Sequence, residues 1–239
     1  MKTLHFLLFF LTAVLAVDAR AASTDLEIAA ASDRPEAERM QAFEALLSVS
    51  RVSSLATVAQ DPNAPVRQRW VAIRALGRIG GDPVRDALSP LLNASVPALR
   101  AATASALADA QIRGSAARIT ELLQDPAIIV RSAAADALGV IRDDVAVTPL
   151  LEALEDPSNT YRGQSLWVRR HYVDALANIG SKAALGGLVR ALRDEDIAVR
   201  SAALEAVERI AGRSYAEGRS RPEQIEAWER WWANQQPRR

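Results

Sequence analysis

A pattern built on six arginines recurs along the chain and constrains its fold more than any other feature. The arginines are separated by 30, 31, 31, 38 and 31 residues, and an alanine stands six residues after each of them. Together, the offsets +3, +6, +7 and +10 mark one apolar stripe of an α-helix. A helical unit of this length that repeats indicates stacked helix pairs, an α-solenoid. The arginines are Arg39, Arg69, Arg100, Arg131, Arg169 and Arg200.

The second half of each unit follows the same register. An apolar residue stands 19 residues after each of the first five arginines, and a leucine stands 23 residues after each of the middle four. Turn residues such as Gly80-Gly81 and Gly180-Ser181 separate the two helices, because glycine readily adopts positive φ past a helix end. The sequence therefore predicts an all-α fold, an α-solenoid of about six helix pairs over residues 33–212, in which each pair needs its neighbours to bury its apolar face.

These residues resemble the HEAT repeat, and specifically the short bacterial kind called the PBS-lyase HEAT-like repeat. The clearest match runs from Asp125-Pro126 through Arg131 to Ile141, and two others cover residues 168–180 and 194–206. The resemblance extends over roughly residues 33–212. It implies the fold far more specifically than a function, because the family includes scaffolds, adaptors and a few enzyme subunits.

The resemblance also implies hydrogen bonds between neighbouring repeats, made by a turn aspartate and a helix arginine six residues apart. The second unit departs from this spacing, because Asp61 precedes Arg67 rather than Arg69 by six residues. The third unit has Asn93-Ala94 where the aspartate belongs. We therefore expect an incomplete ladder. The pairs that keep the spacing are Asp33–Arg39, Asp125–Arg131 and Asp194–Arg200.

The first residues indicate export. A basic start at Met1-Lys2 precedes an apolar run from Leu4 to Val17, and Ala19-Arg20-Ala21 offers small residues for cleavage. This pattern predicts a signal peptide over residues 1–21, with the mature protein in the periplasm or outside a bacterial cell. The alternative is an uncleaved anchor, although spanning a bilayer takes about 20 apolar residues. We expect residues 22–32 to form a flexible lead before the first repeat.

The charge balance excludes partners that need a strong net charge. Loss of residues 1–21 leaves 27 basic and 28 acidic side chains. The mature chain therefore has no bulk electrostatic reason to bind nucleic acid or an anionic membrane surface. With no cysteine, its stability must come from repeat stacking without disulfides. We expect a monomer.

The sequence favours a non-catalytic protein without cofactor or metal. Only two histidines are present, and His5 lies in the predicted signal peptide. His171 is interpreted as an ordinary helix histidine, with a Ser–His–Asp catalyst as the less favoured alternative. Zinc sites need more histidine or cysteine than the chain offers. Asp143-Asp144 is interpreted as a helix cap, with a paired-carboxylate role as the alternative.

The fifth unit is seven residues longer than its neighbours, and its extra length lies between Pro157 and Arg169. We identify Tyr161, Arg162 and Trp167 in this stretch as candidate partner-binding residues, because aromatic and arginine side chains in loops are typical of binding hot spots. The alternative is structural. Tyr172 replaces the usual alanine, and the longer loop would then only repack around it.

A second candidate surface lies on the second helices of the pairs. Positions outside the apolar stripe change from acidic in the middle units to basic in the fifth. By analogy with HEAT proteins, we expect them on the concave surface. The charged candidates are Glu121, Glu152, Glu155, Arg190 and Arg193.

Residues 213–239 are expected to form a linker, a capping helix and a tail. From Arg221 onward, Trp228, Trp231 and Trp232 share one face of a predicted helix. The last repeat has no following repeat to cover it, so the helix is interpreted as a cap. The alternative is a tryptophan platform for a ligand.

Two functions remain open at this point. We favour an exported scaffold or adaptor that binds a protein partner through its solenoid surface. The alternative is a lyase-like subunit that assists attachment of a bilin cofactor, which only the name of the repeat subfamily suggests. Export and the lack of catalytic groups argue against it, because phycobilin attachment is cytoplasmic.

Overall fold

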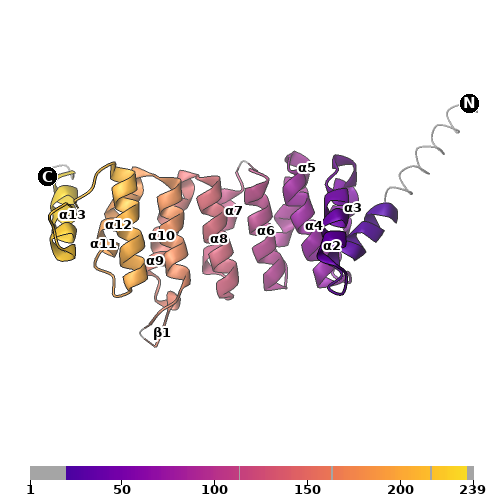
Figure 1. Ribbon diagram of the computed structural model, residues 1–239, viewed down its shortest axis with the longest axis horizontal. Helices are drawn as coiled ribbons and strands as arrows, with labels where there is room; N and C mark the ends of the chain where they lie inside the picture. The colour runs from indigo at the N-terminus through magenta and orange to yellow at the C-terminus, as the bar shows by residue number, and fades with distance from the viewer. Residues whose placement is uncertain (1–19, 113, 163, 216, 236–239) are drawn as a thin grey trace, which may run out of the picture. The chain divides into compact units, whose positions relative to one another are not determined.

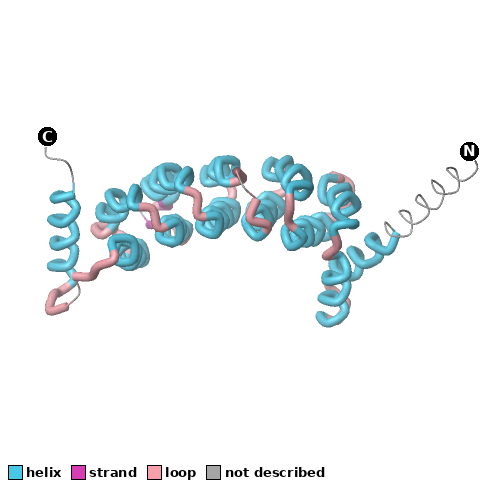
Figure 2. Tube along the Cα trace, turned by 90° about the horizontal axis from the view of Figure 1, so that it is seen from above, coloured by secondary structure: helices cyan, strands magenta, loops and turns pink. Residues whose placement is uncertain are grey.

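The computed structural model describes residues 20–112, 114–162, 164–215 and 217–235, which are almost entirely helical (Figure 1). The chain divides into two compact units, residues 1–112 and 113–239. Within each unit, successive helices alternate between two layers, as the tube in Figure 2 shows. This arrangement confirms the predicted α-solenoid of helix pairs.

The first unit begins with a helix over residues 20–30. Helix α4 packs between α3 and α6. Gly77 of α4 permits a close approach to α6, since a Cβ atom there would lie 2.7 Å from Ala106. The elements that follow are α2 (Glu36–Leu46), α3 (Val52–Gln60), α4 (Val66–Ile79), α5 (Asp82–Leu88) and α6 (Pro97–Asp109), with 3₁₀ turns at Val49–Arg51 and Ser89–Asn93.

The second unit places α8, α10 and α12 side by side, with α9 and α11 packed behind them. A two-stranded antiparallel hairpin, β1 (Thr160–Tyr161) and β2 (Gln164–Ser165), interrupts the helices. The helices are α7 (Ala116–Thr120), α8 (Ile128–Ile141), α9 (Val147–Glu155), α10 (Val168–Ile179), α11 (Leu185–Ala191), α12 (Ile197–Ala211) and α13 (Arg221–Gln235). Short 3₁₀ turns at Glu121–Gln124, Asp144–Ala146, Pro157–Asn159 and Lys182–Ala184 extend or precede them.

The predicted register is confirmed in all six units at the position seven residues after the arginine, where every side chain is at most 1% exposed. In the first repeat, the predicted register is wrong beyond this position. Helix α2 ends at Leu46, and Ser48 adopts an extended backbone. Val49, predicted in the apolar stripe, is therefore 76% exposed.

Residues 22–32 differ from the flexible lead expected for them. The chain is helical from residue 20 to residue 30, and Leu26 is 2% exposed. An ion pair between Asp25 of this helix and Arg51 also holds the helix against the 3₁₀ turn Val49–Arg51. The reason is compositional, because the alanines and Leu26 give residues 22–30 an apolar face that the prediction did not weigh.

The apolar run of the predicted signal peptide, Leu4 to Val17, lies outside the described residues. Among the residues that are described, no single helix has the length and hydropathy of a membrane span. Only Glu36–Leu46 and Val49–Gln60 taken together meet that test of length and composition, and they are bent by 86° relative to each other.

The arginine ladder exists, and between the fifth and sixth repeats it has the expected form, because Arg169 donates to the carboxylate of the turn residue Asp194. Within a unit, the arginine donates to the turn carbonyl six residues earlier, as Arg131 Nη1 does to the carbonyl oxygen of Asp125 at 2.8 Å. Arg100 makes the same bond to Ala94 at 2.7 Å, although the aspartate is missing there. A carbonyl needs no particular side chain, which explains why the third unit tolerates the loss.

The capping helix is confirmed. Helix α13 packs against α11, and Trp228 is fully buried. Trp228 meets Tyr215 and Trp231 edge-on, with ring centroids 4.9 and 5.2 Å apart. Trp232 lies against Gly186 of α11, where a Cβ atom would come within 2.9 Å of the indole ring. The tryptophans therefore cover the apolar side of α11.

Candidate partner-binding surface

The hairpin between α9 and α10 is built from turns that the sequence specifies locally. Asp156 closes the end of α9 by accepting a hydrogen bond from the backbone N–H of Ser158 at 2.7 Å. The two strands then pair in antiparallel register, Thr160 with Ser165 and Tyr161 with Gln164. The backbone N–H of Leu166 donates a hydrogen bond to the carbonyl oxygen of Asn159, with N and O 2.9 Å apart. These hydrogen bonds close the base of the hairpin.

Asn159 anchors the hairpin inside the unit. Its side chain is 1% exposed, and its Nδ2 atom donates to the carbonyl of Ala153 at 2.9 Å. Its Oδ1 atom accepts from the hydroxyl of Tyr172 at 3.3 Å. Burial raises the pKa of Tyr172, which keeps the hydroxyl protonated and able to donate. The longer loop does accommodate Tyr172, as the structural alternative predicted.

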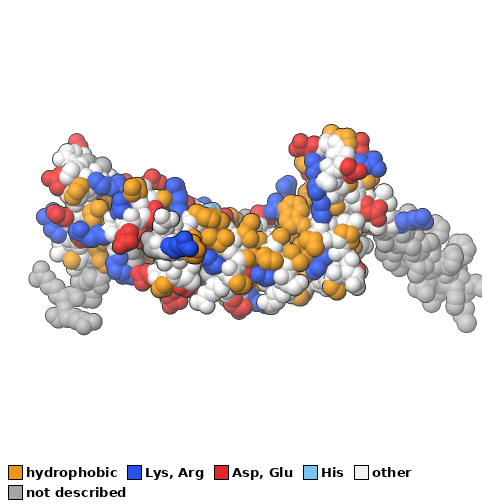
Figure 3. All heavy atoms as spheres, turned by 90° about the horizontal axis from the view of Figure 1, so that it is seen from below, with side chains coloured by type: hydrophobic (Ala, Val, Ile, Leu, Met, Phe, Trp, Pro, Cys, Tyr) orange, Lys and Arg blue, Asp and Glu red, His pale blue; other side chains and the backbone are white. Residues whose placement is uncertain are grey.

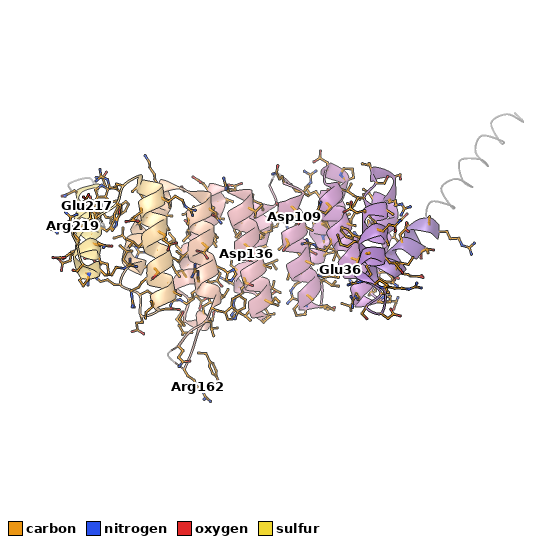
Figure 4. The ribbon with its side chains drawn as sticks, in the orientation of Figure 1. Glu36, Asp109, Asp136, Arg162, Glu217 and Arg219 are labelled. Atoms are coloured by element: carbon orange, nitrogen blue, oxygen red, sulfur yellow. The ribbon has the colours of Figure 1, made fainter. Side chains whose placement is uncertain are left out.

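The tip of the hairpin, unlike Asn159, is exposed to solvent. Tyr161 is 62% exposed, and the guanidinium of Arg162 lies 5.2 Å from the centroid of its ring. Arg162 has a φ of 52°, in the left-handed region that a non-glycine residue seldom occupies. Figure 4 shows Arg162 at the far end of the hairpin, pointing away from the helices. An exposed aromatic ring with a stacked arginine is therefore presented on a rigid base.

Trp167 belongs to the base of the hairpin rather than to its tip. The ring is 53% exposed and meets His171 edge-on, with centroids 5.2 Å apart. His171 in turn contacts Asp136 of α8, with Nδ1 and Oδ1 2.7 Å apart. Trp167 and this His–Asp pair are a second exposed group at the α8–α10 junction. The structure thus brings Tyr161 and Arg162 together and places Trp167 apart from them.

Three of the five charged candidates on the second helices form ion pairs with a neighbouring helix. Arg190 Nη2 lies 2.9 Å from Glu155 Oε1 on the preceding second helix, and Arg193 pairs with Glu229 of α13. The bond to Arg193 lowers the pKa of Glu229. The sequence predicted a row of side chains that changes from acidic to basic. In the structure, the opposite charges of neighbouring helices pair with each other at this change. Of the five candidates, Glu121 and Glu152 are exposed acids that form no ion pair with another described residue.

A cavity of about 300 Å³ lies between the hairpin and the turn that precedes α12. Arg169 and Asp194 form a bidentate ion pair in its wall, with Nη1 and Oδ1 3.0 Å apart. Ser165 of β2 contacts Arg169 at 3.3 Å and also bonds Asp196, which lowers the pKa of Asp196. These contacts tie the second strand of the hairpin to the next repeat.

No group of three potential metal-binding side chains comes together among the described residues. Asp143 accepts a hydrogen bond from the amide of Val145 at 3.0 Å, which confirms its interpretation as a cap. Asp144 accepts from Ser181 of the next turn at 3.0 Å.

Sequence reasoning missed an exposed aromatic group in the first unit. Trp70 is 43% exposed and Met40 is 54% exposed, and both line a groove between α2 and α4. A signal was available, because the residue that follows the repeat arginine is small or polar in most units and tryptophan only here. The corresponding residues are Met40, Trp70, Ala101, Ser132, Arg170 and Ser201.

Comparison with known proteins supports the repeat assignment. The family described as HEAT repeats matches residues 85–167 and 161–225, and the PBS lyase HEAT-like repeat matches residues 68–96. A search among curated proteins finds no match.

Two solved structures are similar in fold. One is a chain of the complex of CpcE and CpcF of phycocyanin lyase from Nostoc sp. PCC7120, with 23% identity and a TM-score of 0.57. The alignment covers 67% of this chain and 65% of that one, so the chain spans less than two thirds of its length. The other is an engineered protein, with 23% identity, a TM-score of 0.53, and coverage of 81% and 90%. Likeness at this identity shows the fold alone.

Proposed function

Because the chain belongs to the HEAT-repeat family, we propose that it is an exported, non-catalytic scaffold or adaptor. It binds a protein partner through its solenoid surface, and the inserted hairpin of the second unit is the main contact. The observation that carries the proposal is the exposed Tyr161–Arg162 pair on a base fixed by Asn159. The other units are built without such an insertion, so the stacking of repeats does not require the tip.

The chemistry of the tip suits a protein partner. Tyrosine and arginine are enriched at hot spots, because each combines a large contact area with directed hydrogen bonds. The fixed base lowers the entropic cost of binding, since the strands are already paired. Trp167 supplies a further exposed ring on the same loop.

The test is capture from periplasmic extract on the immobilised protein, with mass spectrometry of what is retained. We expect one protein to be enriched on the wild type and lost with Tyr161→Ser or Arg162→Ser. Gln164→Ser, on the same hairpin, is the matched control and should retain it. Equal recovery on all four proteins would overturn the assignment to the tip.

Export is part of the proposal and has its own test. Mass spectrometry of the native protein should find a mature N-terminus at or near Ala22. Intact Met1 on a cytoplasmic species would contradict export.

The second candidate function is a lyase-like subunit that assists bilin attachment. The match of residues 68–96 to the PBS lyase HEAT-like repeat and the fold shared with a phycocyanin lyase chain favour it. Incubation with phycocyanobilin and apo-phycocyanin distinguishes the two functions. A scaffold leaves the bilin absorption spectrum unchanged, whereas a lyase-like subunit produces the spectrum of the attached chromophore.

A further inference from the structure

One face of α4 differs from the same face of the equivalent helices. Arg67, Trp70, Arg74 and Arg78 follow one another at spacings of three or four residues, so they share one side of the helix. None of the 14 residues of α4 is acidic. The equivalent residues are Ala98, Ala101, Ser105 and Asp109 in α6, Ile129, Ser132, Asp136 and Val140 in α8, Trp167, Arg170, Asp174 and Asn178 at α10, and Ala198, Ser201, Glu205 and Arg209 in α12. Only α10 also has a tryptophan and an arginine in this set, and there an aspartate accompanies them. Repeat stacking therefore does not demand arginine and tryptophan at these positions.

The side chains of this face are available to a partner. Arg67 and Arg78 are exposed, and Trp70 is 43% exposed. The guanidinium of Arg74 lies 5.9 Å from the indole centroid and 3.6 Å from Asp109 of α6. Arg74 is thus held beside the ring, while Arg67 and Arg78 extend the positive charge along the helix. The face runs from Arg67 to Arg78, eleven helical steps, or about 16 Å at the rise of an α-helix.

A groove of about 240 Å³ lies between this face and α2. Met40 and Phe43 of α2 form one wall, and Trp70 and Val71 form the other. Its rim carries charge, and Figure 4 shows Glu36 at the α2 side. In the space-filling view of Figure 3, hydrophobic side chains gather beside basic ones over the end of the first unit that holds α2 and α4. The groove therefore combines an apolar interior with charged residues at its edge, Arg39 and Glu36 on α2 and Arg74 on α4.

We propose that this groove binds an acidic amphipathic helix of a protein partner. The helix lies along α4, places a bulky apolar side chain among Met40, Phe43 and Trp70, and sets its carboxylates against Arg67 and Arg78. Helices commonly dock in apolar grooves through such anchors, and complementary charge fixes their register. The apolar interior and the overall balance of 29 basic and 29 acidic residues favour a protein over a nucleic acid.

This surface is a different residue set from the hairpin, so the inference goes beyond the proposed function and can fail separately. The probes are two fluorescein-labelled helical peptides with the same leucine and phenylalanine face. One carries glutamate on its remaining positions and the other carries lysine. Binding to the purified protein is followed by fluorescence anisotropy, and circular dichroism confirms that each variant is folded.

We expect the glutamate peptide to bind and the lysine peptide not to bind. Trp70→Ala should weaken the binding about tenfold, as loss of a hot-spot aromatic does. Arg78→Glu should weaken it severalfold, and high salt should do the same because the charges are exposed. Arg209→Glu is the matched control, since it changes the equivalent residue of α12 and should leave the affinity unchanged. Tyr161→Ser should also leave it unchanged.

Three results would overturn the inference. The first is equal binding of the two peptides, or binding of neither. The second is an affinity for the glutamate peptide that Trp70→Ala and Arg78→Glu leave unchanged. The third is tighter binding of a single-stranded DNA oligonucleotide than of the glutamate peptide, which would assign the face to nucleic acid.

Discussion

The amide of Asn159 and the hydroxyl of Tyr172 meet inside the second unit, with Oδ1 and Oη 3.3 Å apart, and this contact joins the inserted hairpin to the core. Tyr172 is fully buried where other units carry a small residue. The inserted hairpin and the large side chain of Tyr172 therefore depend on each other structurally. The contact fixes the base of the hairpin and leaves its tip exposed.

Asn159→Ala should detach the base of the hairpin. The substitution leaves the carbonyl of Ala153 without the amide that donates to it and removes one of the partners of the Tyr172 hydroxyl, which also bonds Arg131. We therefore expect a loss of about 1–3 kcal/mol in the free energy of unfolding. Urea denaturation measures the loss, and limited proteolysis should show faster cleavage within residues 157–167. Gln164→Ala, at an exposed position of β2, is the control. Equal stability and equal cleavage of the two variants would show that the contact does not hold the hairpin.

Asp194→Ala tests the contact between the fifth and sixth repeats. Arg169 and Asp194 are 12% and 13% exposed, and the change leaves the guanidinium without its bidentate partner. We expect a loss of about 2–3 kcal/mol, typical of a hydrogen bond to a charged group. Asp174→Ala removes the exposed pair with Arg170 and should cost less than about 1 kcal/mol in the same urea titration. Equal losses would contradict a larger contribution of the part-buried Arg169–Asp194 pair.

Deletion of every residue after Gly212 should expose the apolar side of α11. Loss of buried Trp228 alone is expected to cost about 3–5 kcal/mol, because large aromatic side chains contribute that much when buried. The melting temperature should fall, and light scattering should reveal oligomers, since an uncovered terminal repeat is sticky. A chain that ends at Gln235 is the control. A stable, monomeric truncation at Gly212 would instead support the ligand-platform interpretation of Trp231 and Trp232.

The attachment of α13 should weaken in acid. The hydrogen bond from Arg193 lowers the pKa of Glu229, so the native state favours the carboxylate more than the unfolded chain does. The stabilisation is therefore complete above the ordinary glutamate pKa of about 4.3 and is lost as the pH falls through the lowered native value. Melting temperatures of the wild type and Glu229→Gln should differ at pH 7 and converge near pH 3. A difference that persists at pH 3 would contradict this assignment.

The sequence predicts the repeat core well, because the register of small and large apolar residues repeats in every unit. Leu138 and Leu176, for example, are fully buried as expected. It predicts the cap for the same reason, since Trp228 lies on the apolar face of its helix. The repeat pattern does not predict the helix over residues 20–30, whose apolar face of alanines and Leu26 lies outside the repeats, or the early end of α2 in the first repeat.

The candidate site was predictable only in part. The length of the fifth unit identified the hairpin, but its anchor at Asn159 depends on tertiary contacts with Ala153 and Tyr172. The pairing of Arg190 with Glu155 depends on which charges face each other across neighbouring helices, and spacing along one helix does not show that. Trp70 was visible in the sequence, but its exposure became clear only with the groove beside α2.

Photo-crosslinking in cells tests most directly whether the hairpin tip contacts a protein partner. A benzophenone amino acid replaces Tyr161 at the tip or, as the control, Glu205 on the exposed side of α12. We predict that irradiation yields one discrete crosslinked protein from position 161, that Arg162→Ser reduces its yield, and that position 205 gives none. Crosslinking from position 205 but not from position 161, or from neither, would contradict the account.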